Sequence, residues 1–153
     1  MNEHPDKLEA ELADTVYRRA NRDDVDYYRD RATSAAGPVL ELGCGTGRIY
    51  LELLAAGVDA DGIDLSEASL TVLRETAEER GLEPRVWRAD MTDVTTDRAY
   101  ALVICPFNAI QALTTVEQQR ALLESVYDLL APRWAVRLRH VRPRLRVHRR
   151  GVG

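Results

Sequence analysis

The chain has 153 residues, 45% of them hydrophobic, which suits one globular domain with a buried core. No apolar run approaches the length of a membrane span, and the polar, acidic N-terminus lacks the pattern of a secretory signal, so we expect a cytoplasmic protein. The two cysteines, Cys44 and Cys105, are too few and too isolated for a disulfide framework or a zinc site, and we expect no metal.

Charge is distributed unevenly along the chain, whose net charge is −4. Residues 1–132 carry 13 basic and 25 acidic side chains, which gives −12, whereas residues 133–153 carry eight arginines and no acid, which gives +8. The acidic part contains a single lysine, Lys7, a composition similar to that of proteins from salt-loving microbes, so we expect a halophile-like surface. Such a surface repels a phosphate backbone, and we do not expect a nucleic-acid partner.

The first 36 residues carry helical patterns. Apolar residues at near-helical spacing predict a first helix over residues 6–19. A second helix is expected over residues 23–36, because its first turn begins with two acids that suit the positive end of the helix dipole. Gly37 and Pro38 stop this helix, so residues 1–36 are expected to form an N-terminal helical segment.

Strand and helix patterns then alternate. Strands are predicted at residues 39–42, within 58–65, and at 85–88 and 99–105, and helices at residues 48–56, 66–80 and after Thr115. Ser66 is the expected N-cap of one helix, and Thr115 with Gln118 forms the capping-box pattern of another. This last helix is expected to bury Leu122, Leu123, Val126 and Leu130. The order predicts an α/β fold, a doubly wound and mostly parallel sheet with helices on both faces.

A glycine-rich loop follows the first predicted strand. Residues 41–47 read ELGCGTG, and their alternating glycines Gly43, Gly45 and Gly47 permit a tight turn and a close approach to the backbone, because glycine has no Cβ. The loop opens a helix whose first N–H groups are free to face a ligand. Ligands in such open sheets lie beyond the carboxyl ends of the strands, so the loop is a candidate binding site.

An acid completes this site. Asp64 ends the next predicted strand, and a right-handed β-α-β unit brings that strand end beside the glycine loop. A carboxylate there can accept hydrogen bonds from both hydroxyls of a ribose, so the loop and the acid together predict a nucleoside site. The dinucleotide fingerprint G-x-G-x-x-G has the same logic, but the sixth residue counted from Gly43 is Arg48 instead of glycine.

The sequence resembles the class I S-adenosylmethionine-dependent methyltransferases over residues 38–130. Residues 39–47, VLELGCGTG, are similar to the first motif of that family, and residues 62–66, GIDLS, to the second. Residues 88–91, RADM, resemble the third motif, and residues 102–108, LVICPFN, the fourth. The resemblance implies a Rossmann-like methyltransferase fold, S-adenosyl-L-methionine as cofactor and transferase activity, that is, methylation of an acceptor. It also implies that the N-terminal helices form a lid over the cofactor.

The same resemblance implies cofactor-binding roles for individual residues. The three glycines would contact the methionine moiety and the ribose through backbone atoms, with Glu41 beneath the cofactor. Asp64 would bind the ribose hydroxyls, and Leu65 would flank the adenine. Asp90 and the backbone N–H of Met91 would reach the adenine edge, although a solvated turn is the alternative for Asp90. Cys105 would lie near the departing methyl group.

The catalytic residues are not defined by any motif. Methyl transfer to an activated donor depends mainly on alignment, so a general base is optional. Asn108 is a candidate for orienting the acceptor, with a turn or N-cap role as its alternative. Tyr28 is a candidate on the N-terminal helices, with helix packing as its alternative. The acidic surface favours a small-molecule acceptor over nucleic acid.

The C-terminal segment departs from the family pattern. After Pro132 the composition changes abruptly to arginine, valine and histidine without any acid. Deleting one base from a permitted back-translation of this segment recodes it as a glycine turn and an alternating strand in which acids return. We therefore interpret residues 133–153 as an arginine-rich, non-native tail, residues 37–132 as the N-terminal part of the S-adenosylmethionine-binding domain, and the sheet as strands 1–4 of seven.

Three interpretations of function remain open from sequence. The first is a methyltransferase, active or truncated. The second is a nicotinamide-dependent oxidoreductase on a related nucleotide-binding fold. The third is a non-catalytic interaction protein in which residues 133–153 act as a basic C-terminal arm. The glycine spacing favours the first over the second, and the acid-free segment is the observation that supports the third.

Overall fold

The computed structural model describes residues 7–9, 12, 23–106 and 109–130. Asn108, most of the expected first helix and the segment 133–153 lie outside the described residues. Residues 7–9 and 12 are helical. The following elements occur in chain order: α2 (Asp23–Thr33), β1 (Val39–Leu42), α3 (Tyr50–Ala55), β2 (Ala60–Asp64), α4 (Glu67–Glu79), β3 (Arg85–Arg88), β4 (Leu102–Ile104), the 3-10 helix η1 (Ala109–Ala112) and α5 (Val116–Leu129).

The strands form one sheet in the order β3-β2-β1-β4, and all three pairings are parallel. The chain reverses its direction of travel across the sheet between β3 and β4, so that β1 and β4 are neighbours although β2 and β3 come between them in sequence. The carboxyl ends of the four strands lie along one edge, where the loop after β1 meets the end of β2. The predicted Rossmann-like, doubly wound fold is confirmed, with four strands among the described residues.

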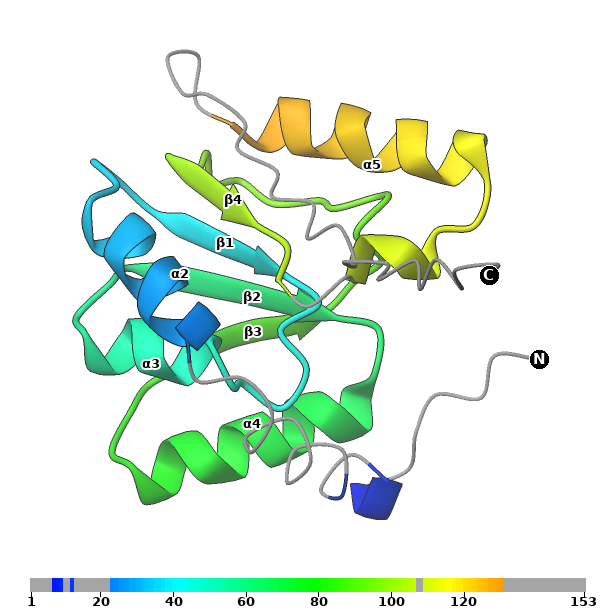
Figure 1. Cartoon of the computed structure of the whole chain (residues 1–153). Coiled ribbons are helices and arrows are strands. Elements are labelled where there is room, and N and C mark those ends of the chain that lie inside the picture. Colours follow the sequence, from blue (N-terminus) through cyan, green and yellow to red (C-terminus); the bar gives the residue numbers. More distant parts are fainter. Residues whose placement is uncertain (1–6, 10–11, 13–22, 107–108, 131–153) are drawn as a thin grey trace, which may run out of the picture.

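Helices cover both faces of the sheet, as Figure 1 shows, with α2, α3 and α4 on one face and α5 on the other. Side chains alternate along the buried strand β1, so that Val39 packs in the cluster beneath α3 and α4 while Leu40 and Leu42 pack beneath α5. Every residue of β1 is buried. This central position holds the end of β1, and therefore the loop that follows it, between two cores.

Local sequence signals place several of these elements. Ser66 caps α4 by accepting a hydrogen bond from the backbone N–H of Ser69 at 3.1 Å. Thr115 and Gln118 form the predicted capping box at the start of α5. Gly57 and Gly81 have positive φ angles just beyond α3 and α4, the conformation in which glycine commonly ends a helix.

Some boundaries differ from the sequence prediction. Helix α2 ends at Thr33, and α3 begins at Tyr50 because residues 48 and 49 still belong to the turn that closes the glycine loop. Strand β4 covers Leu102–Ile104, and Tyr100 makes only an isolated bridge to Leu130. The prediction that Leu123 is buried is wrong, because its side chain is 49% exposed on the outer face of α5.

An ion network fastens the amino ends of β2 and β3. The buried Asp61 accepts hydrogen bonds from Arg85 Nε at 2.7 Å, from Arg98 Nη1 at 2.9 Å and from the Tyr100 hydroxyl at 2.7 Å. The same two arginines also bind Asp59. Burial, with a further contribution from the hydrogen bond to Asp61, raises the pKa of Tyr100 to about 12. The buried charge of Asp61 is therefore fully partnered, as burial of a carboxylate requires.

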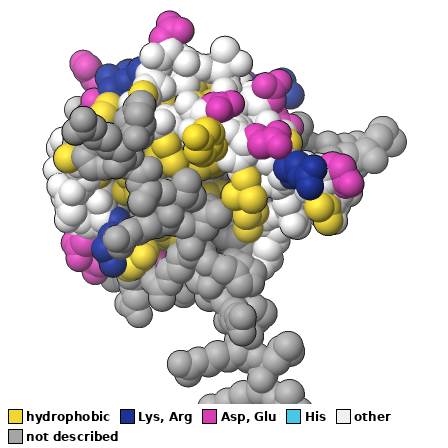
Figure 2. Space-filling view, turned by 90° about the horizontal axis from the view of Figure 1, so that it is seen from above, with side chains coloured by type: hydrophobic (Ala, Val, Ile, Leu, Met, Phe, Trp, Pro, Cys, Tyr) yellow, Lys and Arg dark blue, Asp and Glu magenta, His cyan; other side chains and the backbone are white. Residues whose placement is uncertain are grey.

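The surface over α5 mixes acidic, basic and apolar side chains, and Figure 2 shows acids scattered between separate apolar patches. Three exposed apolar residues lie on α5 itself, namely Val116, Leu123 and Tyr127. In the part of the chain that the structure describes, no helix is both long enough and apolar enough to span a membrane.

Candidate cofactor-binding site

The glycine loop folds against the end of β2. The backbone N–H groups of Gly43 and Cys44 both donate to the Ile63 carbonyl, at 2.8 and 2.9 Å, and the Gly47 N–H donates to the Cys44 carbonyl at 2.9 Å. Gly43, Gly45 and Gly47 all have positive φ angles, of 72°, 53° and 92°. A left-handed conformation costs other L-residues free energy, so the alternating glycines are required by the path of the backbone.

The three glycines have different surroundings. A Cβ on Gly47 would lie 2.8 Å from Leu51 Cγ and 2.9 Å from Leu73 Cγ, so this glycine lets the loop pack onto α3 and α4. A Cβ on Gly43 would lie 3.1 Å from Ala109 Cβ, the first residue of η1. A Cβ on Gly45 would meet nothing within 4 Å, so the middle of the loop is the part whose backbone a ligand can approach.

Asp64 joins the end of β2 to this loop. One carboxylate oxygen, Oδ2, accepts a hydrogen bond from the Gly45 N–H at 2.9 Å, and the other, Oδ1, accepts from the Ser66 N–H at 2.8 Å. The side chain is half-buried and each oxygen keeps a second lone pair. The glycine loop and Asp64 thus lie next to each other as predicted, and Asp64 also fixes the conformation of the loop.

Glu41 lies in β1 just before the loop and is buried, with its Oε2 atom lacking a hydrogen-bond partner. Burial raises the pKa of this carboxyl well above its ordinary value of 4.5, the Arg48 guanidinium opposes the rise, and Asp64 and Asp24 add to it. An unpartnered buried carboxyl is destabilising in itself. Glu41 lies two residues before Gly43, at the carboxyl edge of the sheet.

Arg48 follows the glycine loop and connects it to α2. Its Nη1 and Nη2 atoms donate to the two carboxylate oxygens of Asp24, each at 2.7 Å. The Arg48 side chain is 12% exposed and that of Asp24 is 29% exposed. Paired bonds of this kind between a guanidinium and a carboxylate fix the relative orientation of the two groups. The N-terminal turn of α2 is therefore fastened to the loop.

The remaining predicted residues lie around the same edge of the sheet. Leu65 is 38% exposed beside Asp64, as a side chain available to an aromatic ring would be. The Cε atom of Met91 lies 3.9 Å from the position of a Cβ on Gly43, so the third motif does approach the glycine loop. Cys105 is half-buried at the end of β4, and burial raises the pKa of its thiol to about 11.

Asp90 has a local structural role. Its Oδ1 atom accepts hydrogen bonds from the backbone N–H of Thr92 at 2.8 Å and from the Thr92 hydroxyl at 2.7 Å. This is the turn role that was the alternative from sequence, and it leaves the second oxygen of the exposed carboxylate available. A turn that orients Asp90 and a contact with a ligand are therefore compatible.

Tyr28 shows packing contacts. Its half-buried ring packs against the core cluster beneath α3 and α4, and it meets the Tyr27 ring edge-on with the ring centroids 5.3 Å apart. This matches the helix-packing alternative. The other candidate for catalysis, Asn108, lies outside the described residues. Within residues 7–9, 12, 23–106 and 109–130, no group of three or more His, Cys, Asp or Glu side chains is arranged to hold a metal ion.

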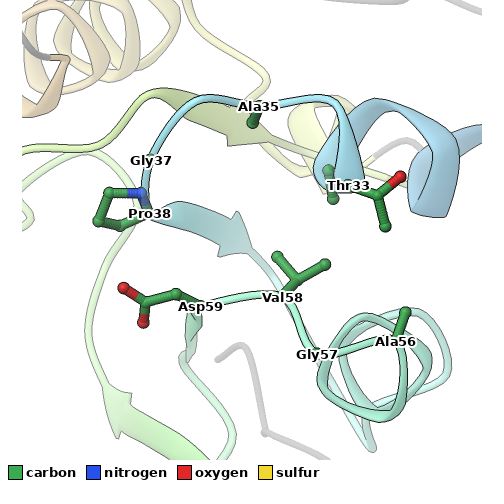
Figure 3. Close-up of a pocket in the computed structure, with 9 residues that line it drawn as sticks. Thr33, Ala35, Gly37, Pro38, Ala56, Gly57, Val58 and Asp59 are labelled. Atoms are coloured by element: carbon green, nitrogen blue, oxygen red, sulfur yellow. The ribbon is translucent and has the colours of Figure 1, made fainter.

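A pocket of about 350 Å³ lies elsewhere, at the amino ends of β1 and β2. Figure 3 shows its lining, in which Pro38 and Asp59 precede the two strands and Gly57 and Val58 follow α3. The loops that carry Gly45 and Asp64 leave the opposite ends of the same strands. This pocket is therefore separate from the candidate site.

Sequence analysis missed Arg48 and Asp24 as neighbours of this site. The sequence indicates Arg48 as the residue that breaks the dinucleotide spacing and begins a predicted helix, and Asp24 as an acid in the first turn of another helix. The two lie 24 positions apart, and neither has a local pattern that indicates its partner. The one signal in the sequence is the position of Arg48 directly after the loop. A guanidinium that is buried there needs an acidic partner.

The parallel sheet order β3-β2-β1-β4, with a glycine loop after β1 and an acid at the end of β2, is that of the Rossmann-like nucleotide-binding folds, and the comparison with known families identifies the class. The family model described as "Methyltransferase domain" matches residues 39–133, which is more than half of the chain. This chain belongs to that methyltransferase domain family. S-adenosylmethionine is the cofactor of the class, and solved relatives include complexes with it.

This chain matches only part of the length of each known relative. The chain is 33% identical over 93 residues to a ubiquinone biosynthesis O-methyltransferase of Nitrosococcus oceani, which is 61% of this chain and 37% of that protein. It is 29% identical to the dTDP-3-amino-3,4,6-trideoxy-alpha-D-glucopyranose N,N-dimethyltransferase of Streptomyces venezuelae, over 76% of this chain and 47% of that one. A solved S-adenosylmethionine-bound amino pentose methyltransferase of Micromonospora echinaspora matches with a TM-score of 0.65 and 28% identity, over 86% of this chain and 55% of that one. The chain thus spans about half, or less, of the length of these relatives.

Proposed function

We propose that this chain binds S-adenosylmethionine at the carboxyl edge of its sheet and belongs to a protein that methylates a small molecule. The observation that carries the proposal is the pairing of Gly45 with Asp64, since the acid orients a loop whose central backbone is open to a ligand. The unpartnered Oε2 atom of the buried Glu41 below the same loop fits a ligand that brings its own hydrogen-bond donors. The open backbone at Gly45 and the unpartnered carboxyl oxygen of Glu41 therefore fit S-adenosylmethionine.

The roles that we propose follow from position. Backbone atoms of Gly43, Gly45 and Gly47 would contact the methionine moiety and the ribose. The free lone pairs of Asp64 would accept from the ribose hydroxyls. Around the adenine, the exposed Leu65 would contact the ring face and Asp90 and Met91 would bind its edge, while Cys105 would lie near the methyl group. When bound, S-adenosylmethionine supplies a methyl group on a positively charged sulfur.

The residues of this chain contribute chiefly orientation. Precise positioning of two reacting groups is worth roughly 7–11 kcal/mol of barrier reduction, and a loop held by Ile63, Asp64 and two cores is suited to it. The carboxylates near the loop also favour a cofactor with a positively charged sulfur over one with a diphosphate, which argues against the nicotinamide alternative. One relative is named for ubiquinone biosynthesis and another for methylation of an amino sugar, and both names support a small-molecule acceptor.

Titration calorimetry with S-adenosylhomocysteine and with NAD tests the proposal. We expect binding of the first and no binding of the second. In Asp64→Ala the ribose hydroxyls lose the carboxylate that we propose accepts from them, and the Gly45 N–H loses the acceptor that orients the loop. Hydrogen bonds to a charged group are worth about 1.5–3 kcal/mol each, so affinity should fall at least tenfold. Glu79→Ala, which removes an exposed acid at the end of α4, is the matched control and should bind like the parent. Binding of NAD alone, or equal affinities for Asp64→Ala and the parent, would refute the proposal.

A further inference from the structure

Two ion pairs attach the segment before β1 to the rest of the domain, one at Lys7 and one at Asp24. Lys7 Nζ lies 2.8 Å from Glu75 Oε1 on α4, and Asp24 at the start of α2 binds Arg48 after the glycine loop. The two attachments differ in character. Both side chains of the Lys7 pair are about half exposed, whereas Arg48 is 12% exposed and binds through two parallel hydrogen bonds. Exposed pairs contribute little, so of these two pairs the Asp24–Arg48 pair is the one that constrains α2, together with the packing of Tyr28 and Ala32 on the core cluster.

Arg48 is placed to couple this helix to the ligand site. It comes immediately after Gly47, where a Cβ would lie 2.8 Å from Leu51 Cγ and 2.9 Å from Leu73 Cγ, so the loop packs closely against α3 and α4 next to Arg48. Its guanidinium acts electrostatically on Glu41, whose carboxyl lies buried below the loop, and at the same time binds Asp24 on α2. One side chain therefore contacts α2 and acts electrostatically on the acid beneath the loop.

We propose that the Asp24–Arg48 pair is a latch that couples the docking of α2 to occupation of the glycine loop by S-adenosylmethionine. Arg48 and Asp24 are positioning residues: they fix the loop and the helix relative to each other and do not contact reacting atoms. Coupling of this kind is reciprocal, because whatever the docked helix adds to cofactor affinity, the bound cofactor adds to helix docking by the same factor. The inference rests on the proposed function, since it names the cofactor that the latch serves.

Amide hydrogen exchange of residues 23–33, measured with and without S-adenosylhomocysteine in the full chain, tests the latch. In the parent, the ligand should slow exchange across α2. In Asp24→Asn, which cannot form the charged pair, exchange should be faster without ligand, and the ligand should no longer slow it. The dissociation constant should rise on the order of tenfold, within the usual range of coupling between two sites. Asp24→Glu keeps the carboxylate and should restore most of the protection and affinity.

Asp26→Asn is the matched control, because Asp26 lies on the same helix and pairs with the exposed Arg29 of that helix instead of the loop. It should behave like the parent in both measurements. Arg48→Gln should reproduce Asp24→Asn, and the double variant should be no weaker in binding than either single one, as expected for two halves of one interaction. Equal ligand protection of α2 in Asp24→Asn and the parent, or an equal effect of Asp26→Asn, would overturn the latch. Failure of the parent to bind S-adenosylhomocysteine would instead overturn the proposed function, and the latch with it.

Discussion

Alanine at Gly45 provides a direct test of where the cofactor approaches the backbone. The φ angle of Gly45 is 53° and a Cβ there would meet nothing within 4 Å, so Gly45→Ala creates no clash inside the protein. Its cost to folding is that of a left-handed L-residue, about 1–2 kcal/mol. For a chain of this size that corresponds to a fall in Tm of about 2–8 °C. The new methyl group would nevertheless occupy the space that we assign to the cofactor.

Gly57 offers a matched control for this change. Its φ angle is 78°, a Cβ there also meets nothing within 4 Å, and it lies at the far end of α3 beside the separate pocket at the amino edge. Gly57→Ala should therefore lower Tm by a similar amount as Gly45→Ala. Thermal unfolding monitored by circular dichroism measures this part of the prediction.

Only one of the two alanine variants should lose cofactor affinity. Calorimetry with S-adenosylhomocysteine should show at least a tenfold weaker binding in Gly45→Ala, a change of about 1.4 kcal/mol or more, and no change in Gly57→Ala. Equal affinities in the two variants would show that the open side of Gly45 is not the binding surface. A fall of Tm in Gly45→Ala far beyond that of Gly57→Ala would contradict the reasoning on the backbone.

Two further predictions concern charge. Burial raises the pKa of Glu41 above its ordinary value of 4.5, so the folded state binds more protons than the unfolded one and the parent loses stability as the pH rises through and beyond 4.5. Glu41→Gln lacks this loss, so its Tm relative to the parent should grow with pH. A Tm difference that is the same at pH 4 and at pH 8 would contradict the assignment, with Glu79→Gln, an exposed acid, as control. The second prediction concerns salt. Residues 1–132 carry a net charge of −12, so KCl should screen the repulsion between acids and Tm should rise between about 0.1 M and about 2 M KCl. A Tm that does not change over this range would count against the halophile-like surface.

Much of the fold was predictable because its signals are local. Strands β1 and β3 have the predicted bounds, and the Ser66 cap and the Thr115–Gln118 capping box occur as expected, since each depends on residues three or four positions apart. The short β4 was harder to delimit. Tyr100 is apolar enough to extend the strand pattern, yet its hydroxyl is bound by Asp61 and its backbone pairs with the end of α5.

The site was predictable only where backbone geometry requires particular residues. The turn after β1 requires glycine at three positions with positive φ, and the acid that binds this turn ends the next strand. Both signals are therefore visible in the sequence. The Asp24–Arg48 pair and the partners of Asp61 are contacts between segments 24 to 39 positions apart, and a single sequence gives no means of pairing them. The exposure of Leu123 was missed because helical spacing alone does not tell how wide the buried stripe of α5 is.

The ion network around Asp61 has a consequence for how the domain tolerates change. It joins β2, β3 and the segment before β4 at the end of the sheet away from the ligand, and each of its carboxylate oxygens is satisfied. Removing a partner from such a buried group typically lowers the free energy of unfolding by about 3–5 kcal/mol, so substitutions there are strongly destabilising. The glycine loop at the opposite end is fixed by separate contacts, those of Asp64 with Gly45 and of Arg48 with Asp24. The sheet is thus held at its amino edge independently of the ligand, so other loops beyond the carboxyl edge can change in length and composition while the framework stays the same.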